Sequence, residues 1–405
     1  MKPNSLFRRL AGNLPGVGLW LAVLPLAALG QANYATPYTF ITLAGRAGIS
    51  GTADGTGSTA RFNGPTGVVL DSAGNLYVAD SGNNTIRKVT PQGLVTTLAG
   101  KAGASGSADG TNSAARFNLT GNGGSLALDS TGNLYLADCN NHTIRKVSPV
   151  GTNWVVTTLA GRAGVAGSAE GTNSVARFYW PCGLATDPVG NLYVADLANN
   201  TIRKVTPDGT NWVVTTLAGM PGYTGGETGN TGSADGTNSA ARFNWPWGLA
   251  LDSAGNVYVA DQVNYTIRKL TPDGTNWVVT TLAGLAKSVG YADGTASTAR
   301  FHDPVGLAVD TNGDIYLAEY MNYTIRKGML ASSVPPPILQ PPSLNAGLFG
   351  FGITGLPGLA VNIESSTNLS SWQLITTFVL MGGTNYYSAS PNPAQGAQFY
   401  RAHVR

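Results

Sequence analysis

The sequence is poor in the residues on which several classes of protein depend. Of its 405 residues, only 2 are cysteine, 3 are histidine and 11% are charged. The 24 basic and 21 acidic residues are spread evenly, with no run of lysine or arginine after the N-terminus. A nucleic-acid-binding surface needs clustered positive charge to neutralise phosphates. We therefore expect no nucleic-acid partner.

Common catalytic signatures are missing as well. The sequence has no Gly-x-Ser-x-Gly elbow, no P-loop and no pairing of a cysteine nucleophile with a histidine. These absences favour a binding or scaffolding protein over an enzyme. We expect no cofactor, with calcium held by loop oxygens as an alternative.

No apolar run is long enough to span a bilayer. The longest, Val17 to Leu29, covers about 13 residues, whereas a transmembrane helix needs about 20. Lys2, Arg8 and Arg9 precede this run and small residues follow it, which is typical of a secretory signal peptide. We predict a signal peptide over residues 1–32, a secreted or periplasmic protein, and no membrane association after cleavage.

Glycine and proline, by contrast, are abundant. The 54 glycines and 22 prolines, with 42% hydrophobic residues, fit many short strands joined by tight turns. A repeat is visible at once, since Leu-Tyr-Val-Ala-Asp or a close variant recurs at spacings of 58, 58, 65 and 58 residues. The acidic ends of these five copies are Asp80, Asp138, Asp196, Asp261 and Glu319.

Each repeat predicts four antiparallel strands. In the first copy they cover Gly67 to Asp71, Leu76 to Asp80, Thr85 to Val89 and Val95 to Leu98, with turn residues between them. The strand Leu76 to Ala79 is apolar on both faces, so each sheet must be covered on both sides. Packing of the sheets around an axis supplies those covers, and the sequence predicts an all-β fold, a five-bladed β-propeller. A solenoid is the alternative architecture.

A displaced strand predicts how the ring closes. The fourth-strand motif Thr-Leu-Ala-Gly occurs five times, and its first copy, at residues 42–45, precedes the first blade. The last blade ends near Gly328 without one. We therefore expect Phe40 to Gly45 to pair with the last blade as its outer strand and to close the ring.

The repeat resembles that of the NHL-repeat β-propellers. The similarity lies in Pro-x-Gly-hydrophobic-Ala-x-Asp, Gly-Asn-Leu-Tyr-Val-Ala-Asp and Asn-x-x-Ile-Arg-Lys, as between Pro246 and Lys269, and it covers roughly residues 40–328. The resemblance implies the fold and a tendency to bind proteins, glycans or nucleic acids, but no single reaction. Many members have six blades and shorter repeats, from which this chain departs.

The remaining segments predict a linker and a second domain. We place the propeller at residues 38–330, a Pro-rich semi-rigid linker at 331–342, and a C-terminal β-sandwich domain at 343–405. The sequence from Ile363 to Trp372, with the closing run from Gln398 to Arg401, resembles a C-terminal β domain found on exported proteins of some bacteria.

Residues shared by every blade are interpreted as structural. The loops before the blades carry an acidic residue followed by Ala-Arg-Phe, as in Asp54 with Arg61, and we expect the acid to close a turn while the arginine pairs locally. Asn83 and its equivalents Asn141, Asn199, Asn264 and Asn322 are predicted to form turns in the left-handed conformation. Arg87 and its equivalents Arg145, Arg203, Arg268 and Arg326 should satisfy carbonyls or carboxylates between blades.

Residues that differ between blades are the better candidates for a site. Blades three to five carry aromatics near one rim, where flat amphipathic rings can stack on sugar faces or anchor a partner loop. The alternative is that these rings pack the long loops. The candidate binding residues are Tyr179, Trp180, Trp245, Trp247, Tyr265 and Tyr323.

Two further hypotheses concern metal and sulfur. His142 and His302 lie on the predicted rim and could converge with Asp303 or Glu319 around a channel metal, as in a metal-dependent propeller lyase or lactonase. No metal-ligand spacing supports this alternative. Cys139 and Cys182 fall toward the same end of the molecule and could form a disulfide between neighbouring blades. The sequence thus predicts a secreted, monomeric binding protein for a glycan or protein partner.

Overall fold

The structure is a computed structural model that describes residues 7–9, 20–22, 42–121, 123–222, 230–329, 337–340, 343–345, 348–355, 360–368, 370–380, 384–389 and 399–404. The chain divides into two compact units. One contains the described residues from 42 to 329, and the other contains those from 337 to 404 together with two short N-terminal strands. Each unit is described separately.

The larger unit consists of five antiparallel sheets, one for each repeat. The first sheet contains β4 (Pro65–Leu70), β5 (Leu76–Asp80), β6 (Thr85–Val89), β7 (Leu94–Gly100) and β3 (Gly55–Thr56), in that order. The second contains β9 (Leu126–Leu128), β10 (Leu134–Asp138), β11 (Thr143–Val150), β12 (Asn153–Gly161) and β8 (Gly110–Thr111). The third contains β14 (Pro181–Thr186), β15 (Leu192–Asp196), β16 (Thr201–Asp208), β17 (Asn211–Ala218) and β13 (Gly171–Thr172). The fourth contains β19 (Pro246–Leu251), β20 (Val257–Asp261), β21 (Thr266–Asp273), β22 (Asn276–Ala283) and β18 (Gly236–Thr237). The fifth contains β23 (Pro304–Val309), β24 (Ile315–Glu319) and β25 (Thr324–Gly328).

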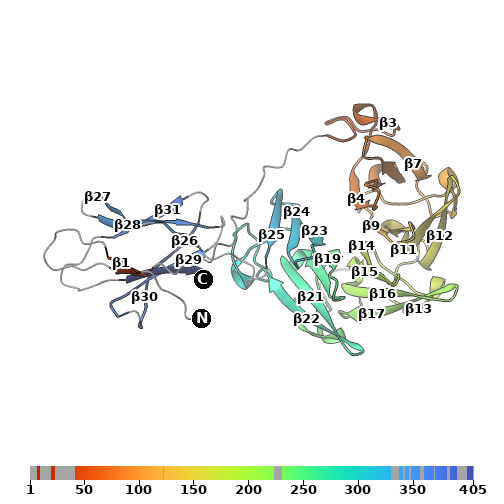
Figure 1. Ribbon diagram of the computed structural model, residues 1–405. Helices are drawn as coiled ribbons and strands as arrows, with labels where there is room; N and C mark the ends of the chain where they lie inside the picture. The colour runs from red at the N-terminus through yellow and green to blue at the C-terminus, as the bar shows by residue number, and fades with distance from the viewer. Residues whose placement is uncertain are drawn as a thin grey trace, which may run out of the picture. The chain divides into compact units, whose positions relative to one another are not determined.

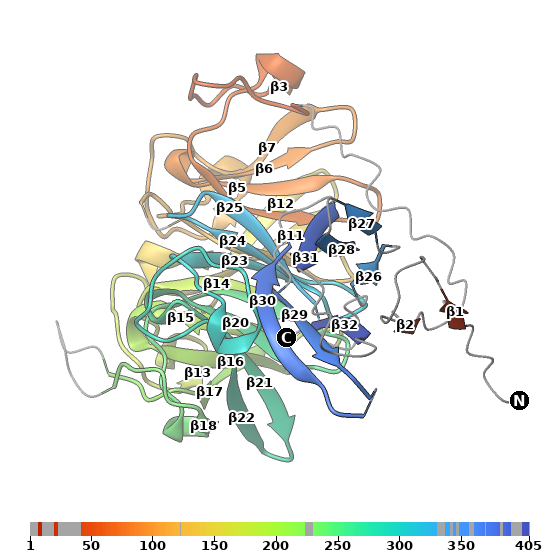
Figure 2. The ribbon, with the colours of Figure 1, turned by 90° about the vertical axis from the view of Figure 1, so that its left-hand side faces the viewer.

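The sheets are arranged radially, as in β-propellers. The inner strands β4, β9, β14, β19 and β23 lie toward the middle of the unit, and β7, β12, β17 and β22 lie at its outside (Figure 1). In the turned view the strands β7, β6 and β5 of the first sheet again lie next to one another (Figure 2). The prediction of an all-β fold is confirmed. The four strands expected in the first repeat correspond to β4 to β7, and the short outermost strand β3 is an addition that the pattern did not predict.

Short 3₁₀ helices punctuate the repeats. One set lies in the loop before the first strand of each sheet, and these helices are η1 (Gly57–Thr59), η3 (Asn112–Ala114), η5 (Asn173–Val175), η7 (Asn238–Ala240) and η9 (Ala296–Thr298). A second set follows the acidic end of the second strand, and these helices are η2 (Ser81–Asn83), η4 (Cys139–Asn141), η6 (Leu197–Asn199) and η8 (Gln262–Asn264). Among the described residues, no helix is long and apolar enough to cross a membrane.

The turn between the first and second strands is fixed by an aspartate. The Asp71 carboxylate accepts hydrogen bonds from the Ala73 and Asn75 backbone N–H groups at 3.0 and 2.8 Å, from the Asn75 amide at 2.9 Å, and from the Tyr77 hydroxyl at 3.1 Å. Gly74 completes the turn at φ +80°, a conformation that glycine adopts without strain. Equivalent aspartates hold the turns of the other repeats.

Adjacent sheets pack through a repeated apolar contact. In the first four sheets, the isoleucine of the third strand lies in the same core cluster as the phenylalanine that precedes the next sheet, as in Ile86 with Phe117 and Ile144 with Phe178. A second contact joins a tyrosine to a tryptophan of the following sheet, with Tyr77 and Trp154 edge to face at a centroid distance of 5.8 Å. Because each of these sheets is covered on both faces, its strands carry apolar side chains on both faces, as they do in the sequence.

The seam between the last and first sheets differs from the other four junctions. Ile325 is 75% exposed, although its equivalents in the first four sheets are buried. The predicted pairing of Phe40 to Gly45 with the last blade is not formed by the described residues, since β25 is an edge strand of a three-stranded sheet. Leu43 and Ala44 instead pack with Phe62 of the first repeat, and Phe40 and Ile41 lie outside the described residues.

The C-terminal unit contains two sheets. One has the order β26 (Ile338–Leu339), β28 (Leu348–Thr354), β27 (Ser343–Asn345), with β31 (Thr384–Ala389) also paired to β28. The other has the order β30 (Gln373–Val379), β29 (Ala360–Ser366), β32 (Phe399–Val404), and β29 and β30 lie side by side in both views (Figures 1 and 2). Phe351, Ile353, Val361 and Ile363 from the two sheets share one buried cluster.

Two short strands, β1 (Phe7–Arg9) and β2 (Trp20–Ala22), pair with each other near the N-terminus. They fall within the predicted signal peptide, whose other residues lie outside the described part of the chain. The signal peptide and the site of its cleavage stay predictions.

Candidate functional site

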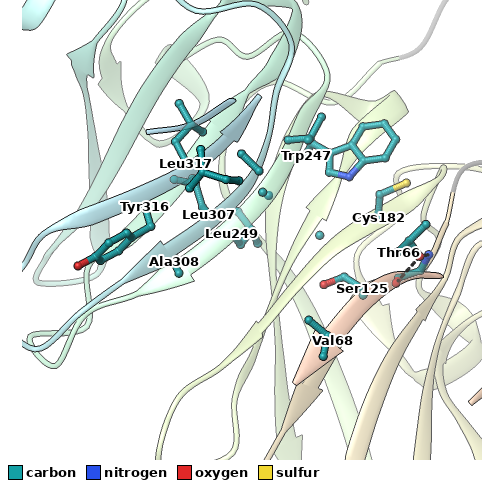
Figure 3. Close-up of a pocket in the computed structure, with 18 residues that line it drawn as sticks. Thr66, Val68, Ser125, Cys182, Trp247, Leu249, Leu307, Ala308, Tyr316 and Leu317 are labelled. Carbon is teal, nitrogen blue, oxygen red and sulfur yellow. Dashed lines mark hydrogen bonds between the residues drawn. The ribbon is translucent and has the colours of Figure 1, made fainter. Parts of the chain in front are cut away.

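The inner strands enclose a cavity of about 420 Å³. Its wall comes from all five repeats, with Thr66 and Val68 from β4, Ser125 before β9, Cys182 from β14 and Trp247 from β19. The last sheet adds Leu307, Ala308, Tyr316, Leu317 and Ile325. Figure 3 shows Cys182, Trp247, Thr66 and Ser125 along one part of this wall and Leu307, Tyr316 and Leu317 along another.

Glycines allow the inner strands to approach one another this closely. A Cβ added to Gly183 would overlap the backbone carbonyl of Trp247, and one added to Gly248 would overlap that of Val305. The glycine of the Pro-x-Gly motif is therefore required by backbone contact near the axis. The side chain of the residue just before it contributes to the cavity wall in Thr66, Cys182, Trp247 and Val305.

The cavity wall is apolar, with a few small polar groups. The Thr66 hydroxyl hydrogen-bonds with the Ser81 hydroxyl at 2.5 Å and lies 3.2 Å from the Gly124 carbonyl oxygen. The Ser125 hydroxyl lies 3.5 Å from the Leu184 carbonyl oxygen. Among the described residues that line the cavity, none is a histidine, an aspartate, a glutamate, a lysine or an arginine. Groups of those types are what acid–base and metal-assisted catalysis use.

The structure divides the six predicted aromatics into separate groups. Tyr179, Trp180 and Trp247 pack around the buried cluster formed by Cys139, Cys182, Leu197 and Ala198. Tyr265 packs edge to face with His302, with ring centroids 6.0 Å apart. Trp245 is 39% exposed, and Tyr323 is 88% exposed at the end of the last sheet. The six residues therefore do not form one continuous rim surface, and Trp245 and Trp247 flank Pro246 at the start of β19.

The two rim histidines serve different contacts. His142 stacks edge to face on Tyr179 at 5.4 Å, and its Nδ1 accepts a hydrogen bond from the Trp180 backbone N–H at 3.3 Å. Burial lowers the pKa of His142, which keeps the imidazole neutral and Nδ1 free to accept. His302 contacts Tyr265 in another repeat. No cluster of three or more histidine, cysteine, aspartate or glutamate side chains suited to a metal occurs in the described ranges, so His142, His302 and Asp303 are not joined into one there.

The repeated arginine is the centre of a buried network. Arg87 donates to the carboxylates of Asp80 and Asp54, both at 2.7 Å, and its guanidinium lies 5.1 Å from the centroid of the Phe62 ring. Asn83 donates to Asp80 at 2.8 Å. The prediction that these arginines satisfy carboxylates and carbonyls is confirmed, although the partners belong to the arginine's own sheet and its preceding loop. Burial raises the pKa of Asp196 and Asp261, the equivalents of Asp80, to about 6, and the neighbouring arginine opposes this shift.

Two details of the sequence interpretation need correction. Arg61 pairs locally as predicted, donating to the carbonyls of Ser58 and Ala60, but Asp54 does not close a local turn, since it pairs with Arg87 and accepts from Thr97. The left-handed residue of the second turn is not Asn83 but the one after it, which is Asn84, His142, Asn200, Tyr265 or Tyr323. The side chain at this position reaches the next repeat, as when Asn84 Oδ1 accepts from the Leu119 N–H at 2.7 Å.

These geometric features are accompanied by a sequence match. The family model for the NHL repeat matches residues 62–89, 124–147 and 243–270, which lie in the first, second and fourth repeats. The chain therefore contains NHL repeats.

Curated relatives of this NHL-repeat protein are longer. It is 29% identical over 286 residues to Protein SUPPRESSOR OF QUENCHING 1, chloroplastic, from Arabidopsis thaliana, a match that covers 70% of this chain and 26% of the relative. It is 29% identical over 309 residues to the human NHL repeat-containing protein 2, covering 68% of this chain and 40% of the relative. The chain thus spans less than half the length of these relatives.

Solved structures with similar folds carry several different descriptions. An auxiliary nutrient binding protein from Bacteroides thetaiotaomicron shares 18% identity, with a TM-score of 0.48 and coverage of 67% of this chain and 60% of the other. The virginiamycin B lyase of Staphylococcus aureus shares 13% identity at a TM-score of 0.39, covering 85% and 96%. A gluconolactonase from Xanthomonas campestris shares 14% identity at 0.41, covering 73% and 84%.

Sequence reasoning missed part of the cavity wall of this NHL-repeat protein. Trp247 and Cys182 stood out because they follow prolines, yet Thr66 and Val305 occupy the same position between proline and glycine. That position differs in every repeat while its neighbours stay similar. Alignment of the repeats on this position would have found the wall residues of four inner strands.

Proposed function

We propose that this chain is a binding protein whose cavity entrance receives a neutral glycan. The observation that carries the proposal is the chemistry of the cavity wall, which offers an indole, small hydroxyls and backbone oxygens but no carboxylate, imidazole or ammonium group among its described residues. Such a wall suits recognition of an uncharged ligand better than acid–base or metal-assisted chemistry.

Trp247 and Trp245 supply the stacking surface in this proposal. Trp247 lines the cavity, and Trp245, two residues earlier, keeps its side chain 39% exposed. Aromatic rings offer an apolar face to the C–H groups of a sugar, and the hydroxyls of Thr66 and Ser125 can exchange hydrogen bonds with its hydroxyls. A cavity of about 420 Å³ lies within the size range of small-ligand sites.

A glycan array followed by calorimetry tests this function. We expect at least one neutral oligosaccharide to bind, and we expect Trp245→Ala and Trp247→Ala each to weaken that binding about tenfold or more. Tyr386→Ala is the control, because Tyr386 is exposed and lies in the C-terminal unit. Absence of any glycan ligand, with retention of a protein partner instead, would overturn the glycan assignment.

We also propose that the five sheets form a closed five-bladed ring in which Thr42 to Gly45 pair with β25. Gly45 has φ +96°, and the glycines that end the fourth strands, Gly100, Gly161, Gly219 and Gly284, have φ between 89° and 93°. A Cβ on Gly45 would lie 3.2 Å from the Phe62 ring, and in the other four junctions the matching distance to the next phenylalanine is 3.0 to 3.2 Å. These two similarities support the assignment of Thr42 to Gly45 as the fourth strand of the last sheet.

The last sheet offers the complementary groups. Asp235 of the fourth repeat accepts from the Thr281 N–H and hydroxyl at 3.0 and 2.8 Å. Its equivalent Asp293 pairs with Arg326 at 2.7 Å. By the repeat alignment, Thr42 is the residue that would supply the missing donors to Asp293. Closure would also cover Ile325 with Phe62, as Ile267 is covered by Phe301.

Export and the C-terminal domain complete the proposal. The predicted signal peptide would deliver the chain to a secreted or periplasmic location, where it acts as a monomer. The two C-terminal sheets, which share one buried cluster, would form a β-sandwich joined by the Pro-rich linker. Sequencing of the N-terminus of exported protein tests the cleavage predicted near residues 30–33.

A further inference from the structure

Cys139 and Cys182 bring two thiols together from neighbouring sheets. Cys139 is the first residue of η4, directly after the acidic end of β10, and Cys182 is the second residue of β14. Both side chains belong to one buried cluster, together with Leu197 and Ala198. Both cysteines are reduced in the structure and buried. Burial raises the pKa of the Cys139 thiol, and the neighbouring Cys182 thiol raises it further. The Cys139 thiol therefore stays protonated at neutral pH.

The surroundings give the two thiols unequal access. Leu197 and Ala198 belong to the same buried cluster, and Tyr179, Trp180 and Trp247 pack against it. Cys182 also lines the cavity, whereas Cys139 is not among the residues that line it. A small reagent entering the cavity therefore reaches Cys182 first and meets Cys139 behind it.

The pair is specific to this junction. At the position of Cys139 the other repeats carry Ser81, Leu197, Gln262 and Tyr320, and at the position of Cys182 they carry Thr66, Gly124, Trp247 and Val305. Residues needed by every repeat, such as the buried arginine, are the same in all five. The two cysteines are absent from the other repeats, so formation of a sheet does not require them. They are therefore candidates for a separate role.

We propose that Cys139 and Cys182 are a redox site that forms a disulfide between the second and third sheets at the wall of the cavity. The oxidant is a small aliphatic disulfide, RSSR. The Cys182 thiolate attacks one sulfur of RSSR, the S–S bond breaks, and the first RS⁻ leaves and takes a proton. Cys139, giving up its proton, then attacks the Cys182 sulfur of the mixed disulfide and releases the second RSH. In total, two protein thiols are oxidised and one RSSR is reduced to two RSH.

The disulfide would have two effects, one on the stability of the fold and one on the side chains at the cavity entrance. It links positions 43 residues apart in the chain (182 − 139), which restricts the unfolded state and raises the melting temperature. It also fixes the cluster on which Trp180 and Trp247 pack. The effect on ligand binding rests on the proposed function, but formation of the disulfide does not.

The test uses the folded full chain and hydroxyethyl disulfide, with intact-mass and peptide mass spectrometry as readouts. For the wild type we expect a loss of two hydrogen atoms, a peptide pair joined through Cys139 and Cys182, and no lasting adduct. Cys139→Ala should keep a mixed-disulfide adduct on Cys182, since the resolving thiol is gone. Cys182→Ala should gain little adduct, because Cys139 lies behind the cavity wall.

The proposal is overturned if the wild type keeps two free thiols, or a stable adduct, while both variants retain the wild-type circular dichroism spectrum. A second readout does not use the variants, so it stands even if they fail to fold. The oxidised wild type should melt at a higher temperature than the same sample after reduction, and equal melting temperatures would contradict a formed bond. A linked peptide pair in a chain that binds no glycan would refute only the binding function.

Discussion

Arg203 donates a hydrogen bond to the Asp196 carboxylate at 2.9 Å, and neither side chain has any exposed surface. The same arginine also donates to the carbonyls of Arg177 and Ala169 and lies over the Phe178 ring. One ion pair thus holds together the second strand, the third strand and the loop before the sheet. Equivalent ion pairs occur in the other repeats, so the free energy that this pair contributes affects the stability of every sheet.

Replacing Arg203 by methionine leaves a buried carboxylate without its counter-charge. We expect Arg203→Met to lower the free energy of unfolding at pH 7.5 by about 3–5 kcal/mol, as measured by urea denaturation. Arg177→Met is the matched control, because Arg177 donates only to backbone carbonyls near η5 and should cost under about 1 kcal/mol. The double change Arg203→Met with Asp196→Asn should recover part of the loss. Equal costs for the two arginines would contradict the prediction.

Closure of the ring has a signature in the Asp293 carboxylate. If Thr42 donates to Asp293 as Thr281 does to Asp235, then Asp293→Ala should destabilise the chain about as much as Asp235→Ala, by about 1–3 kcal/mol each. Both are measured by chemical denaturation of the full chain. A double-mutant cycle of Asp293→Ala with Thr42→Val should show coupling. Additive effects of these two changes would mean that the seam stays open.

The glycine of the inner strand should tolerate no side chain. A Cβ on Gly248 would overlap the Val305 carbonyl and lie 3.2 Å from the Leu307 nitrogen. We expect Gly248→Ala to cost about 1–3 kcal/mol through backbone displacement, seen as a lower melting temperature. Gly328→Ala is the comparison, since its nearest neighbour is 3.7 Å away. A Gly248→Ala variant as stable as Gly328→Ala would show that the inner strands do not approach so closely in solution.

The aspartate turns predict a loss of stability in acid. Partial burial favours the neutral form of Asp129 and Asp252, but hydrogen bonds from Asn133 and Asn256 and their neighbours outweigh it and lower the pKa of each carboxyl from 3.8. A lowered pKa in the folded state means that the unfolded chain binds protons more readily. The stability that these two carboxylates contribute is therefore fully present above pH 4 and falls as the pH drops below it. Melting temperatures between pH 2.5 and 6 measure this fall.

Replacement of the turn aspartates tests the cause. Asp129→Asn with Asp252→Asn should reduce stability at pH 6 and flatten its acid dependence. The exposed Asp208→Asn and Asp273→Asn changes serve as the control, because neither side chain holds such a turn. If the melting temperature of the Asp129→Asn, Asp252→Asn variant falls with pH as steeply as that of the wild type, other carboxylates cause the loss of stability in acid.

The strands of the propeller unit could be predicted because five near-identical copies repeat every local signal. In the hairpin with Asp71, Gly74 and Tyr77, the hydrogen bonds that form the turn join residues close together in the sequence. Local sequence is therefore enough to predict this hairpin. The partner of Asp54 could not be found in this way. Arg61 is closer in sequence, yet Arg87, on the third strand, is the residue that the sheet brings to it.

The binding site was harder to predict, because the candidate residues were selected for being aromatic and not for their contacts in the fold. Aromatics suggested a common rim, but Tyr179 and Trp180 are packed on the cysteine cluster while Tyr265 pairs with His302. The left-handed position was also misassigned, since asparagine is usual there and the tyrosines Tyr265 and Tyr323 are not. Side-chain packing between sheets, which no local pattern records, decides both outcomes.

The contact between Ile86 and Phe117 joins a repeat only to the one that follows it in the chain, and the same holds at Ile144 and Phe178. The four junctions from the first sheet to the last therefore use the same pair of complementary faces. Duplication or loss of one whole unit of 58 residues would leave these junctions chemically unchanged and would alter only the number of sheets. The number of sheets can therefore change by whole repeats without redesign of these contacts.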